Sequence, residues 1–127
     1  MSTTIDPQDN DIAQRIAILD QLLKRMTDLF NEALHLQRRL ELAELTTMER
    51  ATASTTLKSK VEDIEEKITE FREVSQEISL LDIVHVYMEA GWTWYEALDE
   101  ARGQTEGWGN AMNKAEEEVA EMRQGLL

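Results

Sequence analysis

Hydrophobic positions from Ile12 to Leu40 recur in alternating steps of four and three residues, and only Gln37 interrupts them. This spacing keeps one seam on one side of a helix, as in a coiled coil or an antiparallel bundle. The seam consists of Ile12, Ile16, Leu19, Leu23, Met26, Phe30, Ala33 and Leu40. A second apolar row lies beside it, at Ile18, Leu22, Leu29 and Leu36. Together the rows are too wide for one neighbouring helix, which favours contact with several helices or with other copies of the chain.

The pattern predicts a first helix over residues 11–45, a connection at 46–53 and a second helix over 54–90. Threonine and serine crowd the connection, and these residues favour caps and turns over helix interiors. Thr46 and Glu49 have the spacing of a capping box. Because the connection holds neither glycine nor proline, a single continuous helix remains an alternative.

The second helix carries its own apolar stripe, and Gly91 after it is a suitable left-handed cap. The stripe consists of Leu57, Val61, Ile64, Ile68, Phe71, Val74, Ile78, Leu81 and Met88, with a slip in spacing after Phe71. An antiparallel pairing that turns near residue 50 places Arg38 and Arg39 opposite Glu62 and Asp63. Opposite charges then meet, which favours a hairpin over a rod.

Residues 91–127 are expected to form a C-terminal helical cap. Thr93 and Glu96 have capping-box spacing, which predicts a short helix at 94–102 that stops at Gly103. The glycine-rich stretch 103–110 then predicts a flexible loop before a last helix at 110–124.

The expected fold class is therefore all-α: a long antiparallel, coiled-coil-like hairpin with short C-terminal helices packing on its open end. Oligomerisation would complete it as a multi-helix bundle. We expect residues 1–127 to form one domain with a frayed N-terminus at 1–10, although Asp6-Pro7 is able to start a helix.

The amino-acid composition excludes several classes of site. The chain has no cysteine, so disulfides, thiolate metal sites and cysteine nucleophiles are excluded. No apolar run approaches the ~20 residues of a membrane span, and the first residues lack the pattern of a signal peptide. We therefore expect a cytoplasmic protein with no membrane partner.

The formal net charge of −13 discourages direct binding to nucleic acid. Residues 11–45 carry five basic and six acidic side chains, a net charge of −1, whereas 54–90 and 91–127 carry −5 each. An acidic face is expected on the second helix, formed by Glu62, Glu66, Glu70, Glu73 and Glu77. We interpret it as a solvated face; the alternative is mimicry of a phosphate backbone.

Aromatic residues cluster late in the chain: Tyr87, Trp92, Trp94, Tyr95 and Trp108 are all of its tyrosines and tryptophans. Such residues are common at binding hot spots, so Trp92, Trp94, Tyr95 and Trp108 are candidates to bind a partner. The interpretation we prefer is that the cluster plugs the open end of the hairpin, with Trp108 its most exposed member.

Each histidine follows a carboxylate by three positions, as Glu32 precedes His35 and Asp82 precedes His85. Glu-x-x-His pairs build di-metal sites in helical bundles. In a hairpin, however, the two pairs lie about 30 Å apart. We therefore expect no metal ligands, and we expect His85 to be a partly buried core residue.

The sequence contains no phosphate-binding loop and no arrangement of catalytic residues. We expect a non-enzymatic protein without a cofactor: a self-associating helical bundle that acts as an adaptor or structural component. Self-association would use Ile12, Ile16, Leu19, Leu23, Met26, Phe30 and Leu40, and the partners would be the chain itself and an unidentified protein. The alternatives are a small acidic inhibitor that mimics nucleic acid and binds a nucleic-acid-handling protein, and a di-metal carboxylate bundle.

Overall fold

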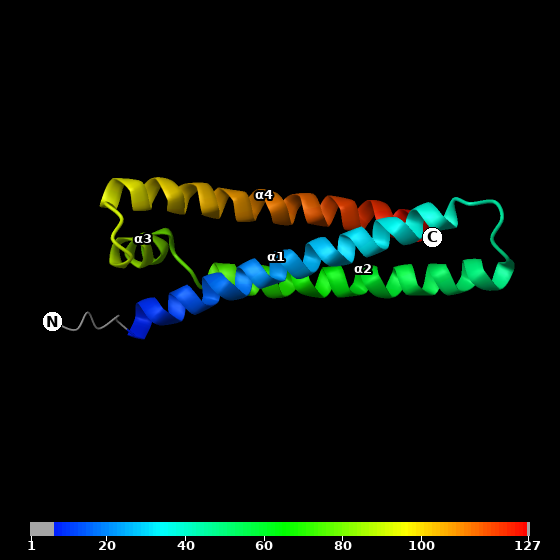
Figure 1. Cartoon of the computed structure of the whole chain (residues 1–127), viewed down its shortest axis with the longest axis horizontal. Coiled ribbons are helices and arrows are strands. Elements are labelled where there is room, and N and C mark those ends of the chain that lie inside the picture. Colours follow the sequence, from blue (N-terminus) through cyan, green and yellow to red (C-terminus); the bar gives the residue numbers. More distant parts are fainter. Residues whose placement is uncertain (1–6, 127) are drawn as a thin grey trace.

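The computed structural model describes the backbone of residues 7–126 and the side chains of residues 11–126. Over this range the chain forms four helices: α1 (Pro7–Leu40), α2 (Thr47–Gln76), α3 (Leu80–Glu89) and α4 (Trp94–Leu126). Figure 1 shows α1, α2 and α4 as three long rods, with α3 across one end. The all-α hairpin of α1 and α2, with C-terminal helices packed on it, is confirmed.

The hairpin turns earlier than expected. Helix α1 begins at Pro7 and ends at Leu40 rather than spanning 11–45, and α2 begins at Thr47 rather than at residue 54. Thr46 caps α2, because its hydroxyl oxygen accepts a hydrogen bond from the backbone N–H of Glu49 at 3.1 Å. The guanidinium of Arg50 donates to the carbonyl oxygens of Leu40 (2.7 Å) and Leu42 (3.0 Å), so α2 satisfies the exposed C-terminal end of α1.

The predicted connection at 46–53 is wrong, because its hydroxyls do not compete with the helix. Thr55 donates to the carbonyl oxygen of Ala51 at 3.0 Å, and Thr56 donates to that of Thr52 at 2.9 Å. These bonds run one turn back along α2 and are compatible with a helix. Ala53, in the same segment, is buried and continues the stripe of Leu57.

Because the turn comes earlier, the two helices also pair in a different register. Lys60 binds Glu32 with an N–O distance of 2.8 Å, and Arg15 binds Glu77 at 2.9 Å. The expected meeting of Arg38 and Arg39 with Glu62 and Asp63 is replaced by a contact of 3.8 Å between Arg39 and Glu49. Opposite charges do meet across the hairpin, but several positions earlier along α2.

The second predicted helix, 54–90, is in fact two helices. Helix α2 ends at Gln76, and Ser79 begins α3 with a complete capping box. The Ser79 backbone N–H donates to the Asp82 carboxylate at 3.0 Å, and the Asp82 N–H donates to the Ser79 hydroxyl oxygen at 3.2 Å. The slip in apolar spacing after Phe71 marks this break, and the S-x-x-D motif that follows is the signal that sequence reasoning missed.

The C-terminal prediction of two short helices and a loop is also wrong, since α4 runs without interruption through Gly103 and the 103–110 stretch. The capping of its start is as expected: the Thr93 hydroxyl oxygen accepts from the Glu96 N–H at 3.3 Å. An apolar stripe crosses the glycines in steps of three and four, through Ala97, Ala101, Thr105, Trp108, Met112, Ala115, Val119 and Met122. Packing of this stripe outweighs the low helix propensity of glycine.

Helix α2 is the central rod, because it packs against both α1 and α4. Phe71 of α2 is fully buried and meets Trp108 of α4 edge to face, with ring centroids 6.1 Å apart. Two ion pairs flank that interface, Arg72 with Glu116 and Arg123 with Glu65. Within residues 7–126, by contrast, no Cα atom of α1 lies within 8 Å of one in α4. The three-rod bundle is therefore open between α1 and α4.

Candidate functional site: two interaction surfaces

The seam of α1 is divided between the core and this opening. Ile12, Leu19 and Met26 are buried in the chain's own core. The other predicted self-association residues are half-buried: Ile16, Leu23, Phe30 and Leu40. Of these, Ile16, Leu23 and Phe30 recur every seven residues and form one edge of α1. A single copy therefore covers the middle of the seam and leaves this edge partly open.

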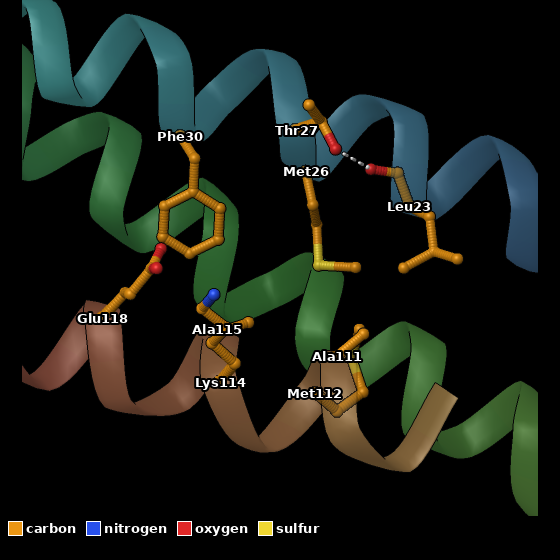
Figure 2. Close-up of a pocket in the computed structure, with 9 residues that line it drawn as sticks. All are labelled: Leu23, Met26, Thr27, Phe30, Ala111, Met112, Lys114, Ala115 and Glu118. Atoms are coloured by element: carbon orange, nitrogen blue, oxygen red, sulfur yellow. Dashed lines mark hydrogen bonds between the residues drawn. The ribbon is translucent and has the colours of Figure 1, made fainter. Parts of the chain in front are cut away.

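The opening is an apolar groove, which we call the α1–α4 groove. Figure 2 shows Met26 and Phe30 pointing from α1 toward α4, with α2 behind them. The groove has a volume of about 210 Å³ and is lined by Leu23, Met26, Thr27, Phe30, Ala111, Met112, Lys114, Ala115 and Glu118. A second hollow of about 260 Å³ lies farther along α1 and α4, at Gln37, Leu40 and Met122, and Leu57 of α2 also lines it. From Leu23 to Leu40 the length along α1 is about 26 Å, which suits a helix.

The polar groups of the groove lie at its margin. The Thr27 hydroxyl donates to the Leu23 carbonyl oxygen at 2.9 Å, so it is satisfied by its own helix. Lys114 is exposed on the α4 side and Glu118 is half-exposed. The helix that forms the other wall belongs to the segment with a net charge of only −1. The groove is thus apolar at its floor, and its α1 wall belongs to the least acidic of the three long segments.

A second surface lies at the opposite end from the hairpin turn, where α3 meets α4 (Figure 1). Its exposed apolar side chains form what we call the end patch: Leu81, Met88, Trp92, Trp94 and Tyr95. The exposed fractions of Trp92, Trp94 and Tyr95 are 39%, 49% and 81%. The expected plug is therefore wrong for these three, which are accessible as partner-binding candidates.

Trp108 is buried, contrary to the expectation. It was expected to be the most exposed aromatic residue, yet its exposed fraction is 7% and it packs on Phe71. The reason is that α4 continues through the two glycines beside it, which turns Trp108 into the core rather than leaving it on a loop. Trp108 belongs to the core and not to a binding surface.

Tyr87 fixes the end patch to the bundle. Its hydroxyl donates to Gln104 Oε1 of α4 at 2.9 Å, and its ring lies 4.8 Å from that of Trp92. Burial raises the pKa of Tyr87, and the nearby carboxylates of Glu100 and Asp20 raise it further. The hydroxyl therefore stays neutral and keeps its hydrogen bond to Gln104 at physiological pH.

The end patch is surrounded by negative charge. Residues 73–101, which contain all five of its side chains, carry seven acidic residues and neither lysine nor arginine. A hollow of about 360 Å³ beside Tyr95 is lined by Glu96, Leu98, Asp99 and Arg102, the last being the nearest basic residue along the chain. Aromatic faces and carboxylates together attract cations.

The predicted acidic face lies on the outer side of α2. Glu62, Glu66, Glu73 and Glu77 are exposed and Glu70 is half-buried. Two of the five are already engaged within the molecule: Glu70 with Lys67 at 3.4 Å, and Glu77 with Arg15. An internally paired carboxylate is less able to imitate a free phosphate, so the row fits a solvated face better.

Both histidines are exposed, and the expectation of a partly buried His85 is therefore wrong. The Glu32 carboxylate of the first predicted pair is bound to Lys60, whose hydrogen bond and charge lower the pKa of Glu32. In the part of the chain that the structure describes, no three His, Asp or Glu side chains are grouped so that they could hold a metal ion.

None of the helices described has the length and apolar character needed to cross a membrane. No protein-family model matches the chain, and no curated protein or solved structure matches it. Function is therefore inferred from the two surfaces.

Proposed function

We propose that the protein is a non-enzymatic assembly protein that associates with a second copy of itself through the α1–α4 groove and acts as an adaptor or structural component. The observation that carries this proposal is the open apolar groove between two helices whose Cα atoms stay more than 8 Å apart in the described residues. Leu23 and Phe30, two residues of the half-buried edge of α1, form one margin of that groove.

The occupant we propose is a helix, because the edge repeats every seven residues. This is the spacing at which one helix contacts another in a left-handed supercoil. A two-fold pairing of antiparallel α1 helices would bring Leu23 of one copy beside Phe30 of the other. Each copy would then cover the apolar edge that the other leaves open.

The occupant is a second copy because charge permits that approach on this flank. Two molecules of net charge −13 repel each other, and the repulsion is least where the local charge is smallest. The segment 11–45 has a net charge of −1, against −5 for each of the other two long segments. The flank formed by α1 is therefore where two copies can meet at the lowest electrostatic cost.

Sedimentation velocity tests the proposal with two groove variants. Leu23→Glu with Phe30→Glu places two carboxylates at the edge, and Thr27→Arg fills the groove from an exposed position that the fold does not depend on. We expect the wild-type protein to self-associate and both variants to be monomeric. Ile18→Glu is the matched control, since Ile18 is exposed on another edge of α1 and its replacement leaves association unchanged.

A monomeric wild-type protein would overturn the proposal, and so would a Thr27→Arg variant that still assembles. Association lost equally in the Ile18→Glu control would show that charge on α1, rather than the groove, governs assembly. A wild-type protein that associates only with a different chain would make that chain the occupant of the groove.

A further inference from the structure

We propose that the end patch is a docking site for a cationic amphipathic segment of another protein, one that combines lysine or arginine with apolar side chains. The site is separate from the α1–α4 groove, so it adds a second kind of partner to the proposed assembly. It would make the assembled protein an adaptor that presents one such site on each copy.

Apolar exposure is concentrated at this end of the molecule. Nine large hydrophobic side chains are exposed in the described residues, and five of them fall within residues 81–95. Leu81 and Met88 are seven residues apart and lie on one face of α3. Trp92, Trp94 and Tyr95 follow in the turn and the first residues of α4. A soluble chain keeps such a concentration uncovered only when it serves contact with something else.

The residues are of the type that dominates binding energy. Tryptophan and tyrosine supply large apolar area at a small cost in conformational entropy, and truncation of one such residue at a hot spot typically weakens binding tenfold or more. Two ring contacts support the patch: Tyr87 with Trp92, and Trp94 with Tyr95 at a centroid distance of 6.2 Å. The rings are therefore held in place before a partner arrives.

Charge determines the partner. Seven acidic residues and no lysine or arginine within 73–101 make this end strongly negative. A cationic segment is attracted to it at long range, and its lysine or arginine heads can lie over the indole rings. The hollow beside Tyr95 has room for one such side chain, and its wall contains the carboxylates of Glu96 and Asp99 as well as Arg102, so its formal net charge is −1. Anionic membranes and nucleic acids are repelled by the same charge.

The partner also needs apolar side chains, because Leu81 and Met88 have no charge to offer and are covered only by apolar contact. An amphipathic helix with lysine on one side and leucine on the other meets both requirements, and it is a common form of peptide recognition. This chemistry distinguishes the proposed partner from a purely basic tail.

Titration calorimetry on the full chain tests the proposal with a synthetic amphipathic helix of about 18 lysine and leucine residues. We expect saturable binding that Trp94→Ala weakens about tenfold. Met48→Ala is the matched control, because Met48 is 79% exposed near the hairpin turn, far from the end patch, and its removal leaves the affinity unchanged. Two further peptides, one with serine for leucine and one with glutamate for lysine, are expected to bind at least tenfold more weakly.

Two double variants distinguish charge at the patch from the net charge of the molecule. Glu96→Gln with Asp99→Asn removes two charges at the patch, and Glu117→Gln with Glu121→Gln removes two exposed charges near the other end of α4. We expect only the first pair to weaken peptide binding. Equal weakening by both pairs, or an unchanged affinity in Trp94→Ala, would overturn the proposal because binding would then follow net charge alone.

Vesicles of phosphatidylcholine, with and without phosphatidylglycerol, test whether the apolar side chains of the patch contact a membrane instead of a peptide. Cosedimentation with vesicles in place of peptide binding would make the patch a membrane contact and overturn the assignment. The Thr27→Arg variant keeps the outcome independent of self-association, because we expect it to bind the peptide as the wild type does even if the groove proposal fails.

Discussion

The α1–α4 groove and the end patch are both apolar, yet they differ in exposure, charge and origin. The groove is lined mainly by buried and half-buried apolar side chains on two long helices, one of which belongs to the least acidic segment of the chain. The end patch is made of exposed aromatic residues at a corner, inside the stretch that has no lysine or arginine. Apolar surface alone therefore does not define a partner. The charge around each surface favours a second copy of the chain at the groove and a cationic segment at the end patch.

Loss of the Phe71 side chain is expected to have the largest effect on stability, because it weakens the packing of α4, the helix that contributes to both surfaces. Phe71 is fully buried and holds Trp108 of α4 on α2. We expect Phe71→Ala to lower the free energy of unfolding by about 3–5 kcal/mol. Urea denaturation followed by circular dichroism measures this change.

Tyr95→Ala is the control for that experiment, since Tyr95 is among the most exposed aromatic residues and its removal should change the free energy of unfolding by less than about 0.5 kcal/mol. A Phe71→Ala protein as stable as the control would contradict the packing of α4 on α2. Both surfaces would then have to be reconsidered, because α4 contributes to each.

Salt is expected to move the two interactions in opposite directions. Between about 50 mM and about 500 mM NaCl, screening reduces repulsion between acidic copies and also reduces attraction of a cationic peptide. We expect self-association to strengthen severalfold and peptide binding to weaken about tenfold over this range. Sedimentation and calorimetry at matched salt concentrations measure both. A shift of the two dissociation constants in the same direction would refute the contrast.

The glycines of α4 allow a smaller test of the segment that connects the two surfaces. Gly103, Gly107 and Gly109 are helical, and a Cβ atom added at any of them meets nothing within 4 Å. We expect replacement of each by alanine to stabilise the protein by about 0.5–1 kcal/mol. Thermal unfolding measures the gain.

Gly91 is the opposite case and serves as the control. Its φ of +99° lies in the left-handed region that glycine tolerates, so Gly91→Ala should destabilise the protein by about 1 kcal/mol despite equal open space. If the three α4 substitutions also destabilised, the helix would have to be interrupted at 103–110, as the glycine pattern alone suggests.

The smallest expected effect concerns acid pH and the hairpin. Lys60 lowers the pKa of Glu32 in the folded state, so the stabilising contribution of this pair is present above the ordinary carboxyl pKa and is lost as the pH falls through the lowered value. The carboxylate is exposed, so the contribution is small. We expect the NMR titration of Glu32 to move to higher pH in Lys60→Met; an unmoved titration would place Lys60 elsewhere.

Local signals in the sequence predicted much of the hairpin. The seam of α1, the cap at Thr46, the positive φ of Gly91 and the cap at Thr93 each depend on a few neighbouring residues, and each is present in the structure. The slip after Phe71 is also visible in the sequence, but spacing alone does not show that the helix ends there. The capping box at Ser79 shows that one helix ends and another begins there.

The long α4 could not be predicted from local propensity. Glycines at 103, 107 and 109 favour a loop, and packing of the buried face of α4, including Trp108 on Phe71, offsets their cost. The same contact decides that Trp108 is buried while Trp94 and Tyr95 are exposed. All three lie in α4, so their exposure depends on position along that helix: Trp94 and Tyr95 are at its start, and Trp108 lies where α4 packs on α2.

Periodicity and charge are properties of the chain alone, so the sequence was enough to show that this protein is helical, acidic and free of cysteine, and which face of α1 is apolar. Tertiary packing was needed to establish the register of the hairpin and the continuity of α4. It also divided the α1 seam between a buried part and an open edge. These features depend on contacts between residues far apart in sequence, and a helical pattern specifies the face of a helix but not the neighbour that covers it.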